Sequence, residues 1–113
     1  LRNIMATTYK VLAQSAPSAT TNTDLYTVPT ATMSVLSTIV VANRSTADCT
    51  YRIAVRPDGA TISNEHYVAY DVTVGASDST TITLGITMDA ADVLTVYAST
   101  ADLSFNVFGS EIA

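Results

Sequence analysis

The chain has 113 residues, of which 48% are apolar and 13% charged, and its net charge is −5. This length predicts one domain with its own core, and the composition excludes a disordered, charge-rich tail. The five basic residues are scattered, so we expect no nucleic-acid-binding patch. Nineteen threonines and eleven serines provide most of the polar surface, and threonine favours strands.

The first residues, "LRNIMATTYK", lack a long apolar segment, so we expect no signal peptide. Met5 is expected to be the natural start, and residues 1–4 are given no role. No apolar run reaches the roughly 18–20 residues of a membrane span, so no membrane contact is expected. Cys49 is the single cysteine, which excludes a disulfide within the chain.

Period-two alternation predicts a strand over residues 7–13, with Tyr9 and Val11 on one face. Residues 14–24, "QSAPSATTNTD", are small and polar and contain Pro17, which predicts a flexible connection. A short strand then ends at Pro29.

Residues 33–43, "MSVLSTIVVAN", are the most apolar stretch and predict a strand with apolar groups on both faces. Strict alternation places Val35, Ile39 and Val41 on one face and Leu36, Val40 and Ala42 on the other. Either this strand is central and buried on both sides, or a neighbouring subunit covers one face. The second alternative makes Leu36, Val40 and Ala42 candidate subunit-interface residues.

The second half of the chain predicts further short strands over residues 51–56, 66–74, 81–88, 93–98 and 103–109. "PDG" at 57–59 supplies a proline and a glycine for a turn, so "RPDGATISNEHY" is expected to join two strands. Alternation places four residues of 66–74 inward (Val68, Tyr70, Val72 and Val74), and it places Ile82, Leu84, Ile86 and Met88 inward in 81–88. About eight short antiparallel strands with turn signals every ~8–12 residues predict an all-β chain. We expect residues 1–113 to form a single β-sandwich domain, immunoglobulin-like or jelly-roll-like.

Two residues are candidates for chemistry, and both have a structural interpretation. His66, the only histidine, is expected to be half-buried at the rim of the core, with Glu65 or a backbone carbonyl as partner. One histidine does not make the usual metal site. Cys49 follows Asp48, a poor setting for a thiolate, and is expected to point into the core. We therefore expect no catalytic site, no metal site and no cofactor.

Tyrosine is the best binding-type feature, because the chain has six tyrosines and no tryptophan. Alternation leaves Tyr67 and Tyr97 facing outward. Tyrosine joins a large apolar body to a hydrogen-bonding tip and is common at protein interfaces. Tyr67 and Tyr97 are therefore candidate subunit-interface residues, with a sugar-stacking site as the alternative.

Three segments carry a family resemblance: "MATTYKVLAQSAPSATTNTDLYTVP", "STIVVANRSTADCTYRIAVRPDGA" and "ITMDAADVLTVYASTADLSFNVFGSEI". Together they make the chain resemble small virion structural proteins of tailed bacteriophages, particularly cyanophages, over nearly all of residues 5–113. The shared motifs are structural, so the resemblance implies a location rather than a set of functional residues.

The resulting hypothesis is a non-enzymatic virion structural protein, assembled in the host cytoplasm and located on the particle. It would form a homo-oligomer as a tail, neck or fibre component or as a capsid decoration. Its expected partners are copies of itself and other virion proteins. The alternative is a receptor- or glycan-binding module on a phage fibre, with a host surface glycan as partner.

Overall fold

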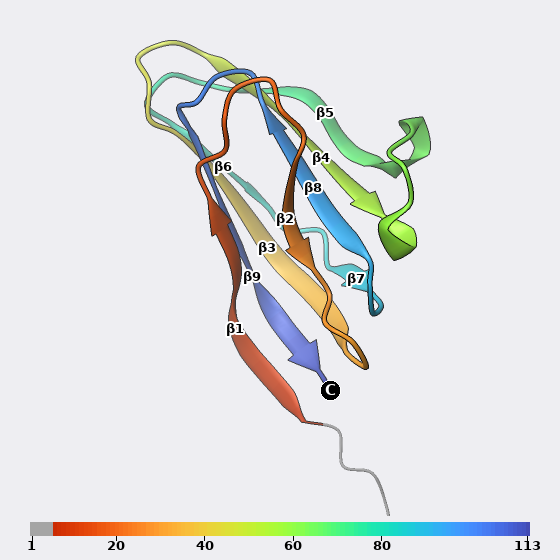
Figure 1. Cartoon of the computed structure of the whole chain (residues 1–113). Coiled ribbons are helices and arrows are strands. Elements are labelled where there is room, and N and C mark those ends of the chain that lie inside the picture. Colours follow the sequence, from red (N-terminus) through yellow and green to blue (C-terminus); the bar gives the residue numbers. More distant parts are fainter. Residues whose placement is uncertain (1–5) are drawn as a thin grey trace, which may run out of the picture.

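Strands in two antiparallel sheets make up most of the chain (Figure 1). This computed structural model describes residues 6–113, so Met5 and residues 1–4, with the expectations attached to them, lie outside the described residues. Sheet A contains β1, β9, β3, β6 and β7, and sheet B contains β2, β8, β4 and β5. The strand bounds are β1 Thr7–Ser15, β2 Thr23–Thr27, β3 Met33–Asn43, β4 Cys49–Arg56, β5 Tyr67–Val74, β6 Ser79–Ile82, β7 Ile86–Met88, β8 Val93–Ala98 and β9 Leu103–Ile112.

The strand pairing is nested, with the first strand paired to the last. β1 pairs with β9, β2 with β8, β3 with β6 and β7, and β4 with β5. Such a folded-over hairpin distributes its strands alternately between two packed sheets, which is the jelly-roll arrangement. The prediction of an all-β sandwich is therefore confirmed, and the pairing selects the jelly roll over the immunoglobulin-like alternative.

The core lies between the sheets and draws on the inward face of each. Tyr51 of β4 and Phe105 of β9 meet edge to face, with ring centroids 6.4 Å apart and ring planes at 79°. Leu103 and Val107 are buried beside Phe105, as the alternation of that segment predicts. Cys49 is also buried in this core, which confirms its expected inward orientation.

A line of irregularities crosses sheet A at one level, and we call it the bulge line. β1 has an extra residue, Leu12, opposite Phe108 of β9. β3 has an extra residue, Ser37, on the other side of Phe108. Beyond β3, the pairing is interrupted at residues 83–85, between β6 and β7. Each bulge moves the inward and outward positions of its strand by one residue.

The bulge line overturns two predicted orientations. Leu36 is 1% exposed and packs in the core with Ile39 and Val41, so the prediction that it shares a face with Val40 and Ala42 is wrong. Leu84 was expected inward within one continuous strand over 81–88. It is 57% exposed, because it lies in the interruption between β6 and β7.

β5, the edge strand of sheet B, contains a third irregularity, at Asp71. Asp71 has a φ of 50°, and the register between β4 and β5 shifts on both sides of Ile53. Aspartate accepts this left-handed conformation more readily than most residues. The shifts leave Tyr70 55% exposed and Val68 45% exposed, so the predicted inward position of both residues is wrong.

The connections between strands lie where turns are predicted, except that the first connection is shorter than the predicted range of residues 14–24. Residues 57–66 join the antiparallel strands β4 and β5, as predicted, through the short 3₁₀ turns η1 (Pro57–Gly59) and η2 (Asn64–His66). Residues 14–24 were expected to be a flexible connection, but β1 continues to Ser15 and β2 begins at Thr23. Within the remaining loop, the Thr20 N–H donates to the Ala98 carbonyl at 2.8 Å.

Candidate functional site

The five residues proposed as a subunit interface do not form one surface. Leu36 belongs to the core. Val40 and Ala42 are half-buried on the outer face of sheet A, where their cross-strand neighbours are Asn106 and Ser104. Tyr67 and Tyr97 lie on sheet B, and both are half-buried. The candidates thus divide between two faces, and each face has its own character.

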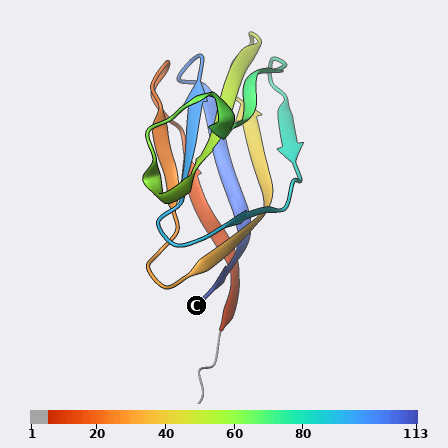
Figure 2. The same cartoon turned by 90° about the vertical axis from the view of Figure 1, so that its right-hand side faces the viewer.

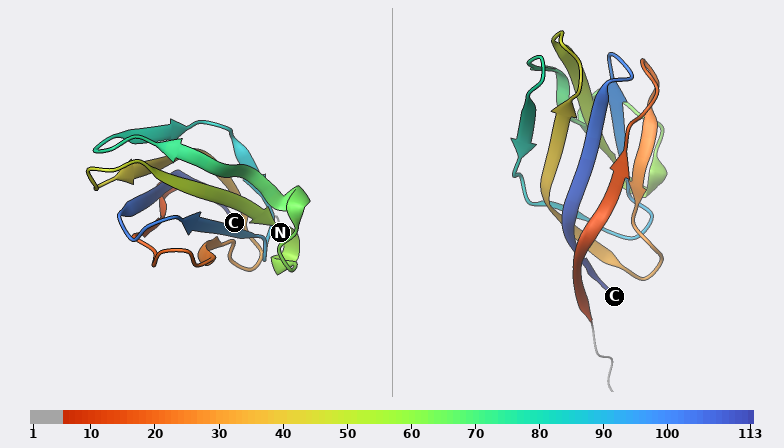
Figure 3. Two further views of the ribbon diagram at one scale, coloured as in Figure 1. Left: turned by 90° about the horizontal axis from the view of Figure 1, so that it is seen from above. Right: turned by 90° about the vertical axis from the view of Figure 1, so that its left-hand side faces the viewer.

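Figure 3 (right) shows the strands of sheet A from the outer side of the sheet. On one side of the bulge line, this outer face carries apolar side chains. We call this region the apolar groove; its lining includes Tyr9 and Val11 of β1, Val35 of β3 and Phe108 of β9, and its volume is about 610 Å³. Tyr9 is 82% exposed, Val11 49% and Phe108 36%. Large apolar side chains gathered in this way are typical of a surface that contacts a partner.

The other side of the bulge line is polar on the same face. Gln14 of β1 donates to the Asn106 side chain of β9 at 2.7 Å. Val40 pairs with Thr81 of β6, and Ala42 pairs with Ser79. The apolar surface of sheet A therefore lies next to Phe108 rather than around Val40 and Ala42. The sequence-based prediction missed it because strict alternation places the exposed and buried positions of β3 wrongly.

The outer face of sheet B is organised around Arg52 of β4. The guanidinium carbon of Arg52 lies 4.2 Å from the ring centroid of Tyr70 on β5 and 4.2 Å from that of Tyr97 on β8. Its Nε donates to the Asp71 carboxylate at 2.6 Å. The hydrogen bond to Asp71 raises the pKa of Arg52 above its ordinary value. One cation thus holds two aromatic rings and one carboxylate in place.

Tyr67 extends this group into a corner on the surface. Its ring centroid is 4.9 Å from that of Tyr70, and the two ring planes stand at 87°. Asn64 of η2 lies beside them, and these three residues line a cavity of about 260 Å³, which we call the tyrosine corner. The segment that carries Asn64, residues 57–66, projects in front of sheet B in Figure 2.

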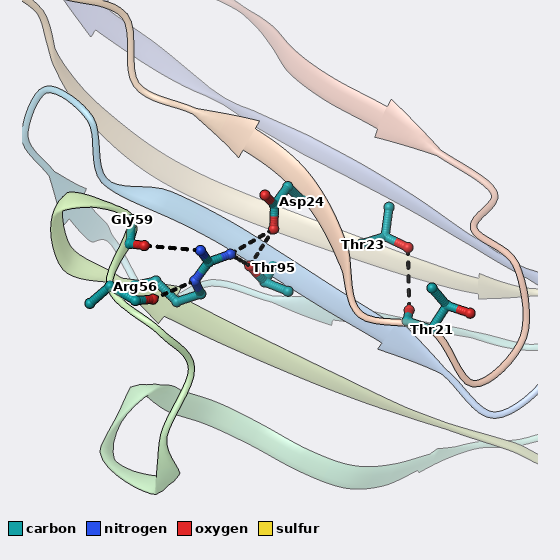
Figure 4. Close-up of polar contacts among 7 residues, drawn as sticks. Thr21, Thr23, Asp24, Arg56, Gly59 and Thr95 are labelled. Carbon is teal, nitrogen blue, oxygen red and sulfur yellow. Dashed lines mark hydrogen bonds and ion pairs between the residues drawn. The ribbon is translucent and has the colours of Figure 1, made fainter.

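Arg56 fixes the first half of that segment (Figure 4). Its side chain donates to the carbonyls of Gly59 at 3.1 Å and Ala60 at 2.8 Å. It also donates to the Asp24 carboxylate at 2.7 Å and the Thr95 hydroxyl at 3.1 Å. Because each of its three side-chain nitrogens donates to the protein itself, we interpret Arg56 as a structural residue that joins the turn after β4 to β2 and β8.

The two residues considered for chemistry have structural partners. Nδ1 of His66 accepts a hydrogen bond at 3.1 Å from the backbone N–H of Ser63, the residue that precedes η2. His66 is half-buried as predicted, but the expectation of Glu65 or a carbonyl as its partner is replaced by this N–H. The Cys49 thiol lies 3.2 Å from the Thr100 hydroxyl inside the core. Neither side chain is arranged as a nucleophile next to a base.

A buried polar network joins the two sheets near the apolar groove. The Tyr26 hydroxyl of β2 lies 2.7 Å from the Ser34 hydroxyl and donates to the Glu111 carboxylate. Lys10 of β1 pairs with Glu111 at 2.7 Å. Burial and the neighbouring Glu111 raise the pKa of Tyr26 to about 12, and the bonds from Lys10 and Tyr26 lower the pKa of Glu111.

Within residues 6–113, no three His, Cys, Asp or Glu side chains are grouped so that they could bind a metal ion. None of the helical segments in this range has the length and hydropathy required to span a membrane. No protein-family model and no curated protein matches the chain. The apolar groove on sheet A and the tyrosine corner on sheet B are the candidate sites for contact with a partner, because both present aromatic side chains at the surface.

Proposed function

We propose that the chain is a non-enzymatic structural protein of a tailed-phage virion, which assembles as a homo-oligomer through the apolar groove. The observation that carries the proposal is the exposed apolar surface of Tyr9, Val11 and Phe108 on the outer face of sheet A. Burying such a surface between copies would remove apolar area from water, which stabilises an assembly by roughly 25 cal/mol per Å².

The fold and the sequence resemblance support the same proposal. Jelly rolls include viral capsid domains, although this is an analogy at the level of the fold. The resemblance to phage virion proteins supports the proposal that the chain is part of a virion. Other virion proteins are the remaining expected partners, and assembly would take place in the host cytoplasm.

The assembly is tested by measuring the mass of the full chain with size-exclusion chromatography and light scattering. We expect a discrete oligomer that Val11→Asp converts to a folded monomer, because the change places a charge in the groove. Val68→Asp is the matched control: Val68 lies on β5 of sheet B and is 45% exposed, against 49% for Val11. A monomeric wild-type chain, or an oligomer that survives Val11→Asp, overturns assembly through this groove.

The location on a particle requires a separate test. Mass spectrometry of purified particles, from phage-infected cultures that express the chain, should detect its peptides in the particle fraction. Peptides that are found in the lysate and not in the particles would contradict the virion proposal while leaving the self-assembly result intact.

A receptor- or glycan-binding module on a phage fibre is the second candidate. The specific observation that favours it is the tyrosine corner, which lies on the sheet opposite the apolar groove. Assembly and binding would then use different surfaces of one domain.

A further inference from the structure

We infer that the tyrosine corner binds one pyranose ring of a neutral glycan, with Tyr67 and Tyr70 as the stacking surfaces and Asn64 as the polar contact. The inference deepens the second candidate function and rests on it. It identifies a different set of residues from the sequence-based alternative, which paired Tyr67 with Tyr97.

The first argument is the shape of the corner. Two rings at 87° whose centroids are 4.9 Å apart present two walls to a ligand rather than one flat platform. A cavity of about 260 Å³ is suited to a single saturated ring and is small for a longer ligand. A pyranose fits such a corner because its axial C–H groups can meet the electron-rich face of one tyrosine while its edge contacts the other.

The second argument is preorganisation. Tyr70 contacts the Arg52 guanidinium as well as Tyr67, and Arg52 is held in turn by Asp71. A ring fixed by its neighbours loses little rotamer freedom when a ligand binds. Tyr97 lies on the other side of Arg52, with its ring 4.2 Å from the same guanidinium, so it supports the arrangement without lining the cavity.

The third argument is charge and polarity. Arg52 and Asp71 compensate each other, and Glu65 adjoins Asn64 on a chain of net charge −5. An anionic ligand would therefore be repelled, and a cationic one would meet the guanidinium already placed on Tyr70. The exposed amide of Asn64 offers two donors and one acceptor, which suits the paired donor and acceptor character of sugar hydroxyls.

A proline-rich peptide is the main competing ligand, because such peptides also dock on tyrosines. Recognition of that kind uses a groove lined by several aromatic rings in sequence. Here the cavity is lined by Tyr67 and Tyr70, and the third tyrosine is engaged by Arg52. The corner is therefore limited to one ring, which favours a sugar residue.

The test is ligand-observed saturation-transfer NMR on the full chain. The probes are the methyl glycosides of glucose, galactose, mannose and N-acetylglucosamine, with an oligoproline peptide as the competing ligand. We expect at least one glycoside to show saturation concentrated on the C–H protons of one ring face. For so small a contact, the dissociation constant should be on the order of 1 mM.

Variants locate the site. Tyr67→Ala, Tyr70→Ala and Asn64→Ala should each abolish or strongly reduce the signal, whereas Leu84→Ala, a change at a 57% exposed residue that lines neither site, should leave it unchanged. Asn64 is exposed, so its substitution keeps the test valid even where a tyrosine variant unfolds. No signal from any glycoside, signal retained in Asn64→Ala and Tyr70→Ala, or signal from oligoproline alone overturns the inference.

The solution mass of the same variants separates this result from the assembly. A Tyr70→Ala chain that keeps its oligomer and loses the glycoside signal supports the tyrosine corner alone. A chain that lacks glycoside binding and still assembles removes the glycan-binding candidate and leaves the structural proposal standing.

Discussion

A side chain at position 109 would collide with the backbone of Val35: an ideal Cβ built on Gly109 lies 2.0 Å from the Val35 carbonyl oxygen. The same Cβ would lie 3.1 Å from Cδ1 of Leu12. Gly109 follows Phe108 at the bulge line, where β1 and β3 both carry an extra residue. Glycine therefore allows the bulged strands to approach β9 closely on both sides.

This contact predicts a large effect for Gly109→Ala. The clash is with backbone, which cannot rotate away, so we expect a loss of about 3 kcal/mol or more in the free energy of unfolding. Gly75→Ala is the control, because a Cβ there lies 3.8 Å from the nearest atoms of Asp78, an ordinary contact. Urea unfolding followed by circular dichroism measures both. Equal midpoints for Gly109→Ala and the wild type would show that β9 can shift to admit the methyl group.

Most of the fold follows from alternation, and its errors have a single cause. The strand segments and the sandwich could be predicted because apolar residues recur with period two along nearly the whole chain. Strict alternation predicts the wrong orientation for four residues, and each lies at or next to a bulge or interruption: Leu36, Val68, Tyr70 and Leu84. A bulge depends on how a strand pairs with its neighbours, and the alternation of apolar and polar residues within one strand does not reveal that pairing.

Aspartate substitutions in β3 separate the two faces. Leu36→Asp should unfold the chain, because Leu36 is 1% exposed and the new carboxylate would be buried without a partner. Val40→Asp should leave the chain folded, since Val40 is half-buried on the polar part of the outer face. Circular dichroism spectra and thermal unfolding distinguish the outcomes. A folded Leu36→Asp chain would contradict the placement of Leu36 in the core.

The candidate sites could be predicted only in part. Tyr97 lies on the outer face as predicted, because β8 pairs with β4 without a register shift and alternation therefore holds along it. Tyr67 also reaches the surface, where it contacts Tyr70. The partnership of Tyr70 with Tyr67 was missed, because the shift at Asp71 reverses its orientation. A signal was present in the aspartate itself, which is an uncommon residue in the middle of an apolar strand and one that accepts a positive φ.

Asp71 therefore offers a test that separates backbone conformation from charge. Asp71→Asn keeps a residue that tolerates a φ of 50° and removes the ion pair with Arg52, so it should cost less than about 1 kcal/mol. Asp71→Val removes the same pair and also forces a β-branched residue into the left-handed region, which should cost roughly 1–2 kcal/mol more. Urea unfolding gives both values. If the two variants were equally stable, the left-handed conformation at position 71 would be ruled out.

The Glu111 carboxylate should contribute to stability at neutral pH and lose that contribution in acid. Lys10 and Tyr26 lower its pKa in the folded chain below the ordinary value of 4.5. A group with a depressed folded pKa stabilises the fold above its unfolded pKa, and the contribution disappears as the pH falls through the folded value. Glu111→Gln should therefore lower stability at neutral pH and flatten its decline below about pH 5.

Lys10→Gln provides the comparison for Glu111. It removes the largest cause of the shift while keeping the carboxylate, so the acid-side decline due to Glu111 should be smaller than in the wild type and should end at a higher pH. The measurement is the urea unfolding midpoint of the wild type, Glu111→Gln and Lys10→Gln at several acidic pH values. Parallel profiles for Glu111→Gln and the wild type would contradict the role of this carboxylate.

Tyr26 gives the opposite pH dependence. Its pKa is raised to about 12 in the folded chain, from an ordinary value of 10.0, first by burial and then by Glu111. A raised folded pKa means that stability is full below pH 10 and falls as the pH rises toward 12, because the unfolded chain releases the proton first. The loss over this range should be about 3 kcal/mol. Tyr26→Phe should remove it, with alkaline unfolding as the measurement.

Titration of tyrosinate absorbance provides an independent readout of Tyr26. In the wild-type chain, Tyr26 should ionise only at high pH. The same holds for Tyr51, whose pKa is also raised by burial. Tyr26→Phe should remove one of these two groups, so the absorbance change at the alkaline end of the curve should become smaller. A curve unaltered at its alkaline end by Tyr26→Phe would mean that this hydroxyl reaches solvent, and the network of Tyr26, Ser34 and Glu111 would have to be open rather than buried.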